Sequence, residues 1–209
     1  MEISKELAEL VGIIIGDGNI YQKHHKYRVG FVGDINNDKL YFNYIKDLIK
    51  KEWDKEARIF IGGRGIRIVI NSKRICQMLI NELKLPYGEG KYERAIIPEI
   101  IAKNWNLAKH TIRGIIDTDG SVFVSKKPRV AKYPCIEIST NSDKLAIQLK
   151  RILEEKKFRV NKIRRSTSKM SAGITNRIAL NGKSNLQKWL NEIGFSNPYK
   201  LERAISYLK

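Results

Sequence analysis

The stretch Leu10-Val-Gly-Ile-Ile-Ile-Gly-Asp-Gly-Asn-Ile20 returns 102 residues later as Ile112-Arg-Gly-Ile-Ile-Asp-Thr-Asp-Gly-Ser-Val122. Both copies carry an early glycine and end their apolar segment in Asp-Gly. Three further echoes follow in the same order, at offsets of 105, 110 and 109 residues: Asn36-Asn-Asp-Lys-Leu40 with Asn141-Ser-Asp-Lys-Leu145, Ile70-Asn-Ser-Lys73 with Leu180-Asn-Gly-Lys183, and Lys91-Tyr-Glu-Arg-Ala-Ile96 with Lys200-Leu-Glu-Arg-Ala-Ile205. Collinear echoes with slightly different offsets indicate an internal duplication whose insertions fall in loops.

Each half predicts the same order of elements, α-β-β-α-β-β-α. In the first half, Ser4 can cap a helix in which Leu7, Leu10, Val11 and Ile14 follow helical spacing. Alternating and β-branched residues then predict strands, with an amphipathic helix between them that includes Leu40. The expected ranges are helices 4–17, 38–53 and 72–83 with strands 27–32, 58–61 and 66–70, then helices 107–117, 144–155, 185–192 and 201–208 with strands 122–124, 136–139, 159–164 and 177–180, and residues 86–106 as the connection.

The composition favours an intracellular protein that meets a polyanion. The 209 residues include 40 Lys and Arg against 22 Asp and Glu, a formal net charge of +18. The start carries acids and helix formers, and no apolar run approaches the ~20 residues that span a bilayer, so we expect neither secretion nor a membrane partner. Cys76 and Cys135 have no spacing to each other or to a histidine that predicts a zinc site or a disulfide.

The paired stretches resemble the two signature helices of the LAGLIDADG homing endonucleases in their monomeric, archaeal intron-encoded, two-repeat form, and the resemblance covers nearly the whole chain. It implies an α+β fold of two pseudo-symmetric αββαββα repeats, residues 1–97 with the start of the linker and residues 98–209. In that family two antiparallel four-stranded sheets form a DNA-binding saddle, and the motif helices pack at the interface. The last acid of each motif lies at the bottom of the saddle, which corresponds here to Asp17 and Asp119.

The residues themselves indicate a metal site at these acids. Gly12 and Gly114 would let two helix backbones approach closely and so bring Asp17 and Asp119 together. Each acid ends a helix, where the helix dipole repels an anion, so the pair needs a cation. Hard divalent metals take oxygen ligands and activate water for phosphodiester hydrolysis. The resemblance adds the backbone carbonyls of Gly16 and Thr118 as metal ligands. The alternative interpretation of each Asp-Gly is an ordinary helix end or tight turn.

The two motifs differ from the family's pattern at two positions, and two lysines complete the predicted active site. Ile15 replaces the earlier acid of the motif that Asp117 keeps, and Arg113 stands where the family prefers a small residue, which puts ideal packing of the second helix in question. Lys73 and Lys183 follow the last strand of each repeat and resemble the family's catalytic lysines. The alternative for each is a surface lysine in the first turn of a helix.

The hairpins are rich in cations that an uncovered sheet face could present to a DNA groove. For each of these cations, contact with a phosphate is favoured over readout of a base. The candidate DNA-binding residues are Arg28, Arg58, Arg64, Arg67, Lys126, Lys127, Arg129, Lys132, Lys162, Arg164, Arg165, Lys169 and Arg177.

The function that we predict is site-specific cleavage of both strands of double-stranded DNA. The resemblance implies a monomer that cuts a long, pseudo-symmetric site across the minor groove with Mg²⁺ and leaves short 3′ overhangs. Mn²⁺ is expected to substitute, and Ca²⁺ to support binding without cleavage. The same scaffold also serves as an intron RNA-splicing maturase and as a non-cleaving DNA-binding regulator. Both acids are kept, which favours the endonuclease.

Overall fold

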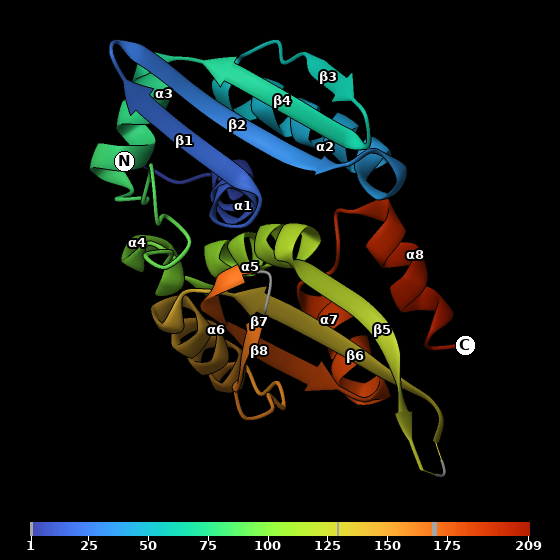
Figure 1. The fold of residues 1–209 in the computed structure, drawn as a ribbon. Coiled ribbons are helices and arrows are strands. Elements are labelled where there is room, and N and C mark those ends of the chain that lie inside the picture. The colour runs from blue at the N-terminus through green and yellow to red at the C-terminus, as the bar shows by residue number, and fades with distance from the viewer. Residues whose placement is uncertain (1, 129, 169–170) are drawn as a thin grey trace.

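A computed structural model gives the architecture of residues 2–128, 130–168 and 171–209 (Figure 1). Each repeat opens with a long helix, followed by two hairpins separated by a second helix. The elements are α1 (Lys5–Ile15), β1 (Gly18–Lys23), β2 (Lys26–Asp34), α2 (Ile35–Trp53), β3 (Ile59–Gly62), β4 (Gly65–Asn71), α3 (Lys73–Gln77), the π-helix η1 (Met78–Glu82), α4 (Glu99–Ala102), α5 (Trp105–Asp119), β5 (Gly120–Lys127), β6 (Val130–Thr140), α6 (Asp143–Glu155), β7 (Arg164–Ser168), β8 (Ser171–Asn181), α7 (Lys183–Glu192) and α8 (Pro198–Ser206).

The strands form two antiparallel four-stranded sheets with the same topology, β1-β2-β4-β3 and β5-β6-β8-β7. Their registers also correspond, because Gly18 pairs with Phe31 in the first sheet and Gly120 with Ile138 in the second. The α+β, two-repeat architecture predicted from the sequence is therefore confirmed. In Figure 1, α1 and α5 lie side by side between the two sheets.

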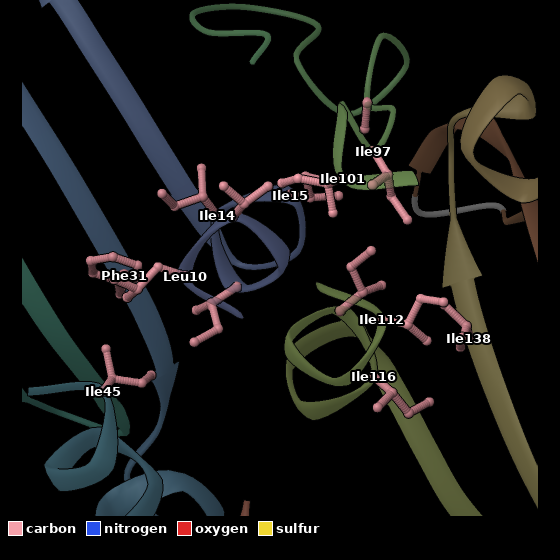
Figure 2. Packing of buried hydrophobic residues seen from close by; sticks show 14 of the residues in the cluster. Leu10, Ile14, Ile15, Phe31, Ile45, Ile97, Ile101, Ile112, Ile116 and Ile138 are labelled. Carbon is pink, nitrogen blue, oxygen red and sulfur yellow. The ribbon is translucent and has the colours of Figure 1, made fainter. Parts of the chain in front are cut away.

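Alternation of side chains decides which face of each sheet the helices cover. In β4, Ile66, Ile68 and Ile70 are buried, whereas Arg67 between them is exposed. The motif helices join the apolar faces of both repeats into one core, in which Leu10 and Ile14 meet residues such as Phe31, and Ile112 meets Ile138 (Figure 2). The opposite face of each sheet stays open. Within the described ranges, no helix is long and apolar enough to cross a membrane.

The terminal segment of each repeat crosses to the other repeat. The backbone of Ile97 accepts from and donates to the side-chain amide of Gln148 on α6, at 2.9 and 2.8 Å. In the opposite direction, the amide of Asn197 before α8 donates to Asp38 on α2 at 2.9 Å. These reciprocal contacts hold the two repeats together.

Two sequence expectations are wrong in detail, and a third is borne out with a change of helix type. Leu40 is 65% exposed, whereas Leu145, its partner in the second echo, is 2% exposed. The buried positions of the two helices correspond at an offset of 104, so that echo is one residue out of register. The strand expected at 159–164 is β7 at Arg164–Ser168, because β8 is longer than expected and pairs with residues nearer the turn. The helix expected at 72–83 widens into the π-helix η1 (Met78–Glu82), which keeps Leu79 and Leu83 buried.

Candidate functional site

The two motif helices approach so closely that only glycine fits at their crossing. A β-carbon on Gly12 would overlap the carbonyl of Thr111, and one on Gly114 would lie 2.5 Å from the carbonyl oxygen of Glu9. Both obstacles are backbone atoms, which cannot swing aside. The close approach predicted from Gly12 and Gly114 is confirmed, and it brings the two helix ends together.

Asp17 and Asp119 lie next to each other at these helix ends and keep part of their surface in solvent. A carboxylate oxygen of Asp119 lies 3.3 Å from where a β-carbon on Gly16 would stand, so Asp119 adjoins the residue just before Asp17. Burial, together with the negative charge of Asp17, raises the pKa of Asp119 to about 7. Burial also raises the pKa of Asp17. Two carboxylates this close attract a cation or share a proton.

Two lysines, one from each repeat, hold the helix ends below the acids. The Lys91 ammonium donates to the carbonyls of Ile14 at 3.2 Å, Gly16 at 3.1 Å, and Gly18. The Lys200 ammonium donates to the carbonyls of Ile116 and Asp117, both at 2.8 Å, and Thr118 at 3.1 Å. The Ile14 and Gly16 carbonyls are the repeat equivalents of those of Ile116 and Thr118. Each ammonium thus neutralises carbonyls at the negative end of a helix dipole.

The electrostatics of the two lysines are similar but not equal. Burial lowers the pKa of Lys91, and the charges of Asp119 and Asp17 counteract that shift. Burial also lowers the pKa of Lys200, where Asp117 is the acid that counteracts it most. At the position equivalent to Asp117, the first repeat has Ile15. The second lysine therefore has an additional buried anion beside it.

Asp117 is fully buried and ties the motif helix to the segment before α8. One carboxylate oxygen accepts from the backbone N–H of Ser196 at 2.7 Å, and the other has no hydrogen-bond partner among the residues that the structure describes. Burial raises the pKa of Asp117 to about 7. The side chain thus fixes the approach of the loop that delivers Lys200.

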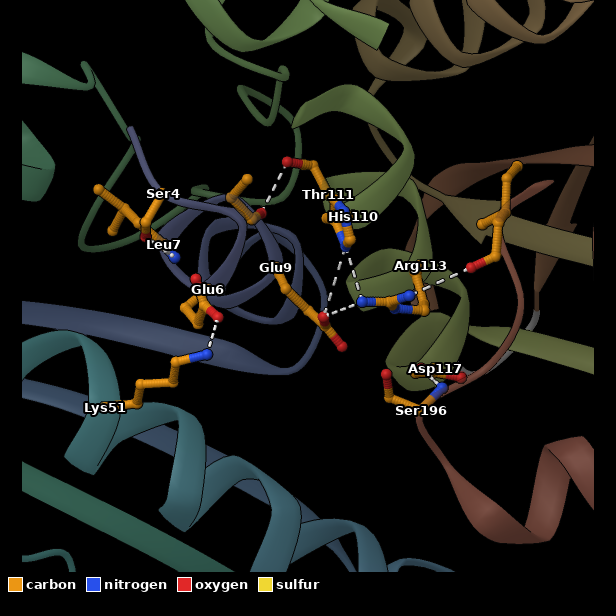
Figure 3. A network of polar contacts seen from close by, with 12 residues as sticks. Ser4, Glu6, Leu7, Glu9, Lys51, His110, Thr111, Arg113, Asp117 and Ser196 are labelled. Carbon is orange, nitrogen blue, oxygen red and sulfur yellow. Dashed lines mark hydrogen bonds and ion pairs between the residues drawn. The ribbon is translucent and has the colours of Figure 1, made fainter. Parts of the chain in front are cut away.

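The rest of the helix interface contains a polar network that accommodates Arg113 (Figure 3). Arg113 forms an ion pair with Glu9, whose side chain is 2% exposed, and donates to the carbonyl of Ile193 at 3.3 Å. It also contacts Nδ1 of His110 at 2.7 Å, and Thr111 donates to the carbonyl of Ala8 at 2.6 Å. The bulky residue is therefore compatible with close helix packing, because a buried carboxylate on α1 receives its guanidinium.

The acid pair opens into a cavity of about 580 Å³ between the repeats. Both motif acids line it, with Lys91 and Gly16 from the first repeat and Ser139, Thr140 and Thr175 from the second. Oxygen atoms of carboxylates, hydroxyls and carbonyls dominate the polar lining. This cavity can admit a phosphate group and water.

The donor set fits a hard divalent cation that is shared with a substrate. Within the described part of the chain, no three His, Cys, Asp or Glu side chains gather in a metal-binding arrangement. The protein offers two carboxylates, at Asp17 and Asp119, and the carbonyl oxygens of Gly16 and Thr118, each of which also accepts from a lysine ammonium. Mg²⁺ is commonly held by one or two carboxylates while phosphate and water complete its shell. The all-oxygen set at this site matches that pattern.

The chain is similar to known proteins both in sequence and in fold. Residues 107–194 match the LAGLIDADG-like domain family. The complete chain has the fold of two-repeat LAGLIDADG homing endonucleases: it aligns with I-DmoI in complex with DNA and Mn at a TM-score of 0.66 and 19% identity, covering 92% of this chain and 98% of that one. It aligns with I-WcaI bound to its DNA recognition sequence at a TM-score of 0.62 and 16% identity, covering 100% of this chain and 88% of that one. I-DmoI has also been solved with DNA in the presence of Ca and of Mg.

Curated relatives by sequence are Replication factor C small subunits. That of Methanocaldococcus jannaschii is 27% identical over 209 residues, which cover 100% of this chain and 10% of the relative. That of Thermococcus kodakarensis is also 27% identical, over 97% of this chain and 21% of the relative. The chain thus spans about a tenth and a fifth of the length of these relatives.

The structure does not bring Lys73 and Lys183 to the acids. Lys73 follows β4 beside the β1–β2 turn, and its ammonium lies 5.8 Å from the ring centroid of Tyr27. Lys183 reaches the carbonyl of Leu208 at 3.4 Å. Both residues follow the end of a strand whose register carries it away from the start of β1 or β5, so neither lines the acid cavity. The prediction that Lys73 and Lys183 lie at the acids is therefore wrong, and the lysines at the helix ends are Lys91 and Lys200, which the fourth repeated segment aligns.

The candidate DNA-binding cations within the described residues lie on or next to the hairpins of the two sheets, and the two repeats support them differently. In the first, Arg28 stacks 5.0 Å from the ring centroid of Tyr21. In the second, Arg165 pairs with Asp143 at 2.9 Å. Arg58, Arg64, Lys126, Lys132 and Lys162 are exposed, with no ion pair inside the described ranges. Arg129, Lys169 and the side chain of Lys127 lie outside the described residues.

Proposed function

We propose that this chain is a metal-dependent, site-specific endonuclease that hydrolyses one phosphodiester bond on each strand of double-stranded DNA. It cuts across the minor groove of a long, pseudo-symmetric site and leaves short 3′ overhangs. One chain supplies both acids, so we propose that it acts as a monomer. Its fold matches that of homing endonucleases solved on DNA.

The observation that carries this proposal is the meeting of Asp17 and Asp119 at the pseudo-twofold axis, beside a cavity that both repeats line. A protein that only binds DNA has no need of two adjoining carboxylates that face phosphate, because they repel it. Burial raises the pKa of both aspartates, and at Asp119 the negative charge of Asp17 adds to that effect. A divalent cation would remove that repulsion.

Asp17, Asp119 and the backbone carbonyls of Gly16 and Thr118 would hold the metal. When bound, a divalent ion polarises the phosphate and lowers the pKa of a bound water molecule. Mg²⁺ is the ion that we propose, with Mn²⁺ as a substitute, because neighbouring structures contain DNA with Mn, Mg or Ca. Lys91 and Lys200 keep the helix-end carbonyls fixed and place a positive charge beside each acid, where it offsets charge on a scissile phosphate.

The test begins with sites that the protein itself selects from a library of randomised duplexes in Ca²⁺. A supercoiled plasmid carrying a selected site is then incubated in Mg²⁺ and scored for nicked and linear forms. Wild-type protein should linearise it, and Ca²⁺ should leave it intact. Asp17→Asn or Asp119→Asn should slow cleavage by orders of magnitude without weakening the gel shift, because the change keeps shape and removes negative charge.

Asp47→Asn is the matched control, since Asp47 is an exposed acid on the outer helix α2. It should cleave like the wild type. A double variant of Asp17 and Asp119 that still linearises the plasmid at the wild-type rate would refute the catalytic assignment. Binding of an intron RNA with no cleavage of any selected duplex would instead favour the maturase interpretation.

A further inference from the structure

The register of the two sheets identifies a pair of equivalent arginines on their open faces. Ile68 pairs with Phe31 in the first sheet, and Ile178 pairs with Ile138 in the second, so Arg67 on β4 corresponds to Arg177 on β8. Both strands are interior strands of their sheets. The same register makes Phe60 equivalent to Arg164, because each lies opposite the arginine of its own repeat, and makes Gly30 equivalent to Glu137.

Both arginines point away from the helices. Arg67 is exposed between the buried Ile66 and Ile68, and the side chain of Arg177 is 50% exposed next to the fully buried Ile178. They stand close to the bottom of the saddle, since Gly30 and Glu137 pair with residues only one position beyond the glycine that ends each motif. Cations at hairpin turns lie nearer the rim, where the DNA backbone passes, whereas interior strands face the floor of a groove.

The first repeat supports its arginine with an aromatic ring. The guanidinium carbon of Arg67 lies 5.7 Å from the ring centroid of Phe60, which is 44% exposed. Gly30 beside it offers no side chain, and no acid pairs with Arg67 within the described residues. Stacking restrains the plane of the guanidinium but leaves it free to slide across the ring.

The second repeat supports its arginine with a carboxylate. Glu137 has a side chain that is 11% exposed, with one oxygen 3.7 Å from Arg177 and the other 3.4 Å from Arg164. Each guanidinium gives one edge to the acid and keeps its remaining N–H groups for the open face. Because the acid contacts both arginines, neither can turn without losing a partner. Glu137 thus fixes the direction in which Arg177 presents its free donors.

A fixed guanidinium on a groove floor reads one base better than any other. Its parallel N–H donors match the two acceptors O6 and N7 that only guanine presents together in the major groove. We infer that Arg67 and Arg177 each read a guanine at mirror-related positions of the target, and that Glu137 is a positioning residue that makes the second half-site the stricter one. This inference rests on the proposed DNA-binding function.

The test is a binding selection in Ca²⁺ from randomised duplexes, followed by affinity measurements on single-base variants of the selected site. The wild-type protein should select guanine at two positions equidistant from the centre. Arg177→Lys should lower the preference for guanine about tenfold at one of them and leave the mirror position unchanged. Glu137→Gln should lower it several-fold at that same position while total affinity for DNA stays equal or rises, since a negative charge facing DNA is lost.

Phe60→Leu should have its effect only at the other position, and a smaller one. Lys50→Gln, on the outer face of α2, serves as the control and should alter neither preference. Arg164→Ala, at an exposed site, gives a second way to loosen Arg177 if Glu137→Gln unfolds, and a thermal melt shows whether it does.

Two failures can be told apart. If the protein selects no duplex at all, the proposed function falls and the inference falls with it. If it selects a site without guanine at mirror positions, or if Glu137→Gln weakens binding equally at every position, the readout assignment is wrong and DNA binding stands.

Discussion

The two repeats agree in the atoms that face the acid pair and differ in what stands behind them. Asp17 and Asp119, Gly12 and Gly114, and Lys91 and Lys200 occupy matching places in the fold. At the supporting positions, the first repeat has Ile15 and Gly30 where the second repeat has the acids Asp117 and Glu137. The chemistry of cutting two equivalent phosphates demands symmetry, whereas recognition of two different half-sites does not. The supporting residues are therefore where the repeats could diverge.

The largest expected effect comes from the two lysines. Lys91→Met or Lys200→Met should slow single-turnover cleavage by about 10²–10³, the usual loss when one preorganised donor is removed from a reacting site. Only Lys200→Met should also destabilise the fold strongly, because it leaves Asp117 without its nearest cation, whereas Lys91 stands beside Ile15. Plasmid cleavage and urea unfolding measure the two losses separately.

Lys73→Met and Lys183→Met are the matched controls, because these lysines recur in both repeats but stay away from the acid cavity. They should cleave at close to the wild-type rate. Loss of cleavage in these controls, with no loss for Lys91 and Lys200, would return the catalytic role to the ends of the last strands.

The next effect tests whether the helix crossing is equally tight on both sides. Gly12→Ala and Gly114→Ala should each lower the free energy of unfolding by about 2–4 kcal/mol, because the new methyl group meets backbone atoms of the facing helix. Gly62→Ala should change it little, since no atom lies within 4 Å of a β-carbon built there. Chemical denaturation of the three variants checks this, and a stable Gly12→Ala protein would mean that the helices lie farther apart.

The sequence was sufficient for the parts of the site that each repeat builds locally. Asp17, Asp119, Gly12 and Gly114 all fall inside one nine-residue motif, so spacing alone could predict that they meet. Lys91 and Lys200 lie more than 70 residues beyond the motif glycines, and only the return of the chain brings them to the helix ends. The repeated segment that aligns these lysines indicates that they are equivalent, but it does not predict which carbonyls they contact.

The prediction that Lys73 and Lys183 lie at the acids was wrong for a different reason. Repetition shows that two residues are equivalent, but it does not show at which end of a sheet they lie. That depends on strand register, which places Asn71 opposite Arg28 and therefore three residues along β1 from its start. The sequence also could not decide whether Arg113 fits the close packing of the motif helices, since that depends on Glu9 from the other motif helix.

A smaller expected effect is a dependence of stability on pH to which the second motif helix contributes and the first does not. The second motif helix carries His110 where the first has Ala8, and burial together with the charge of Arg113 lowers the pKa of His110 to about 4. The unfolded chain would bind a proton at the ordinary pKa of 6.5, so the stability that neutral His110 contributes is complete above pH 6.5 and is lost as the pH falls toward 4. The loss is on the order of 3 kcal/mol.

The raised pKa values of Asp117 and Asp119 act in the opposite direction, because their protonated forms favour the folded state at low pH. The measurement is therefore the difference in unfolding free energy between the wild type and His110→Gln at pH 7, 5.5 and 4. That difference should shrink with acid. A difference that stays constant would mean that the imidazole of His110 has the same pKa in the folded and the unfolded chain.

The smallest expected effect compares the cations of the two sheets. Arg64 is exposed and has no ion pair within the described part of the chain, whereas Arg165 pairs with Asp143 at 2.9 Å. If both reach phosphates, Arg64→Gln should reduce the slope of log K against log salt by about 0.9, the contribution of one phosphate contact on duplex DNA. Arg165→Gln should reduce it less, because Asp143 already compensates part of that charge, and Lys50→Gln on α2 should leave it unchanged. Gel shifts over a range of salt concentrations give the slopes. Equal reductions for Arg64 and Arg165 would show that DNA displaces the Asp143 pair completely, and the two sheets would then differ in base readout alone.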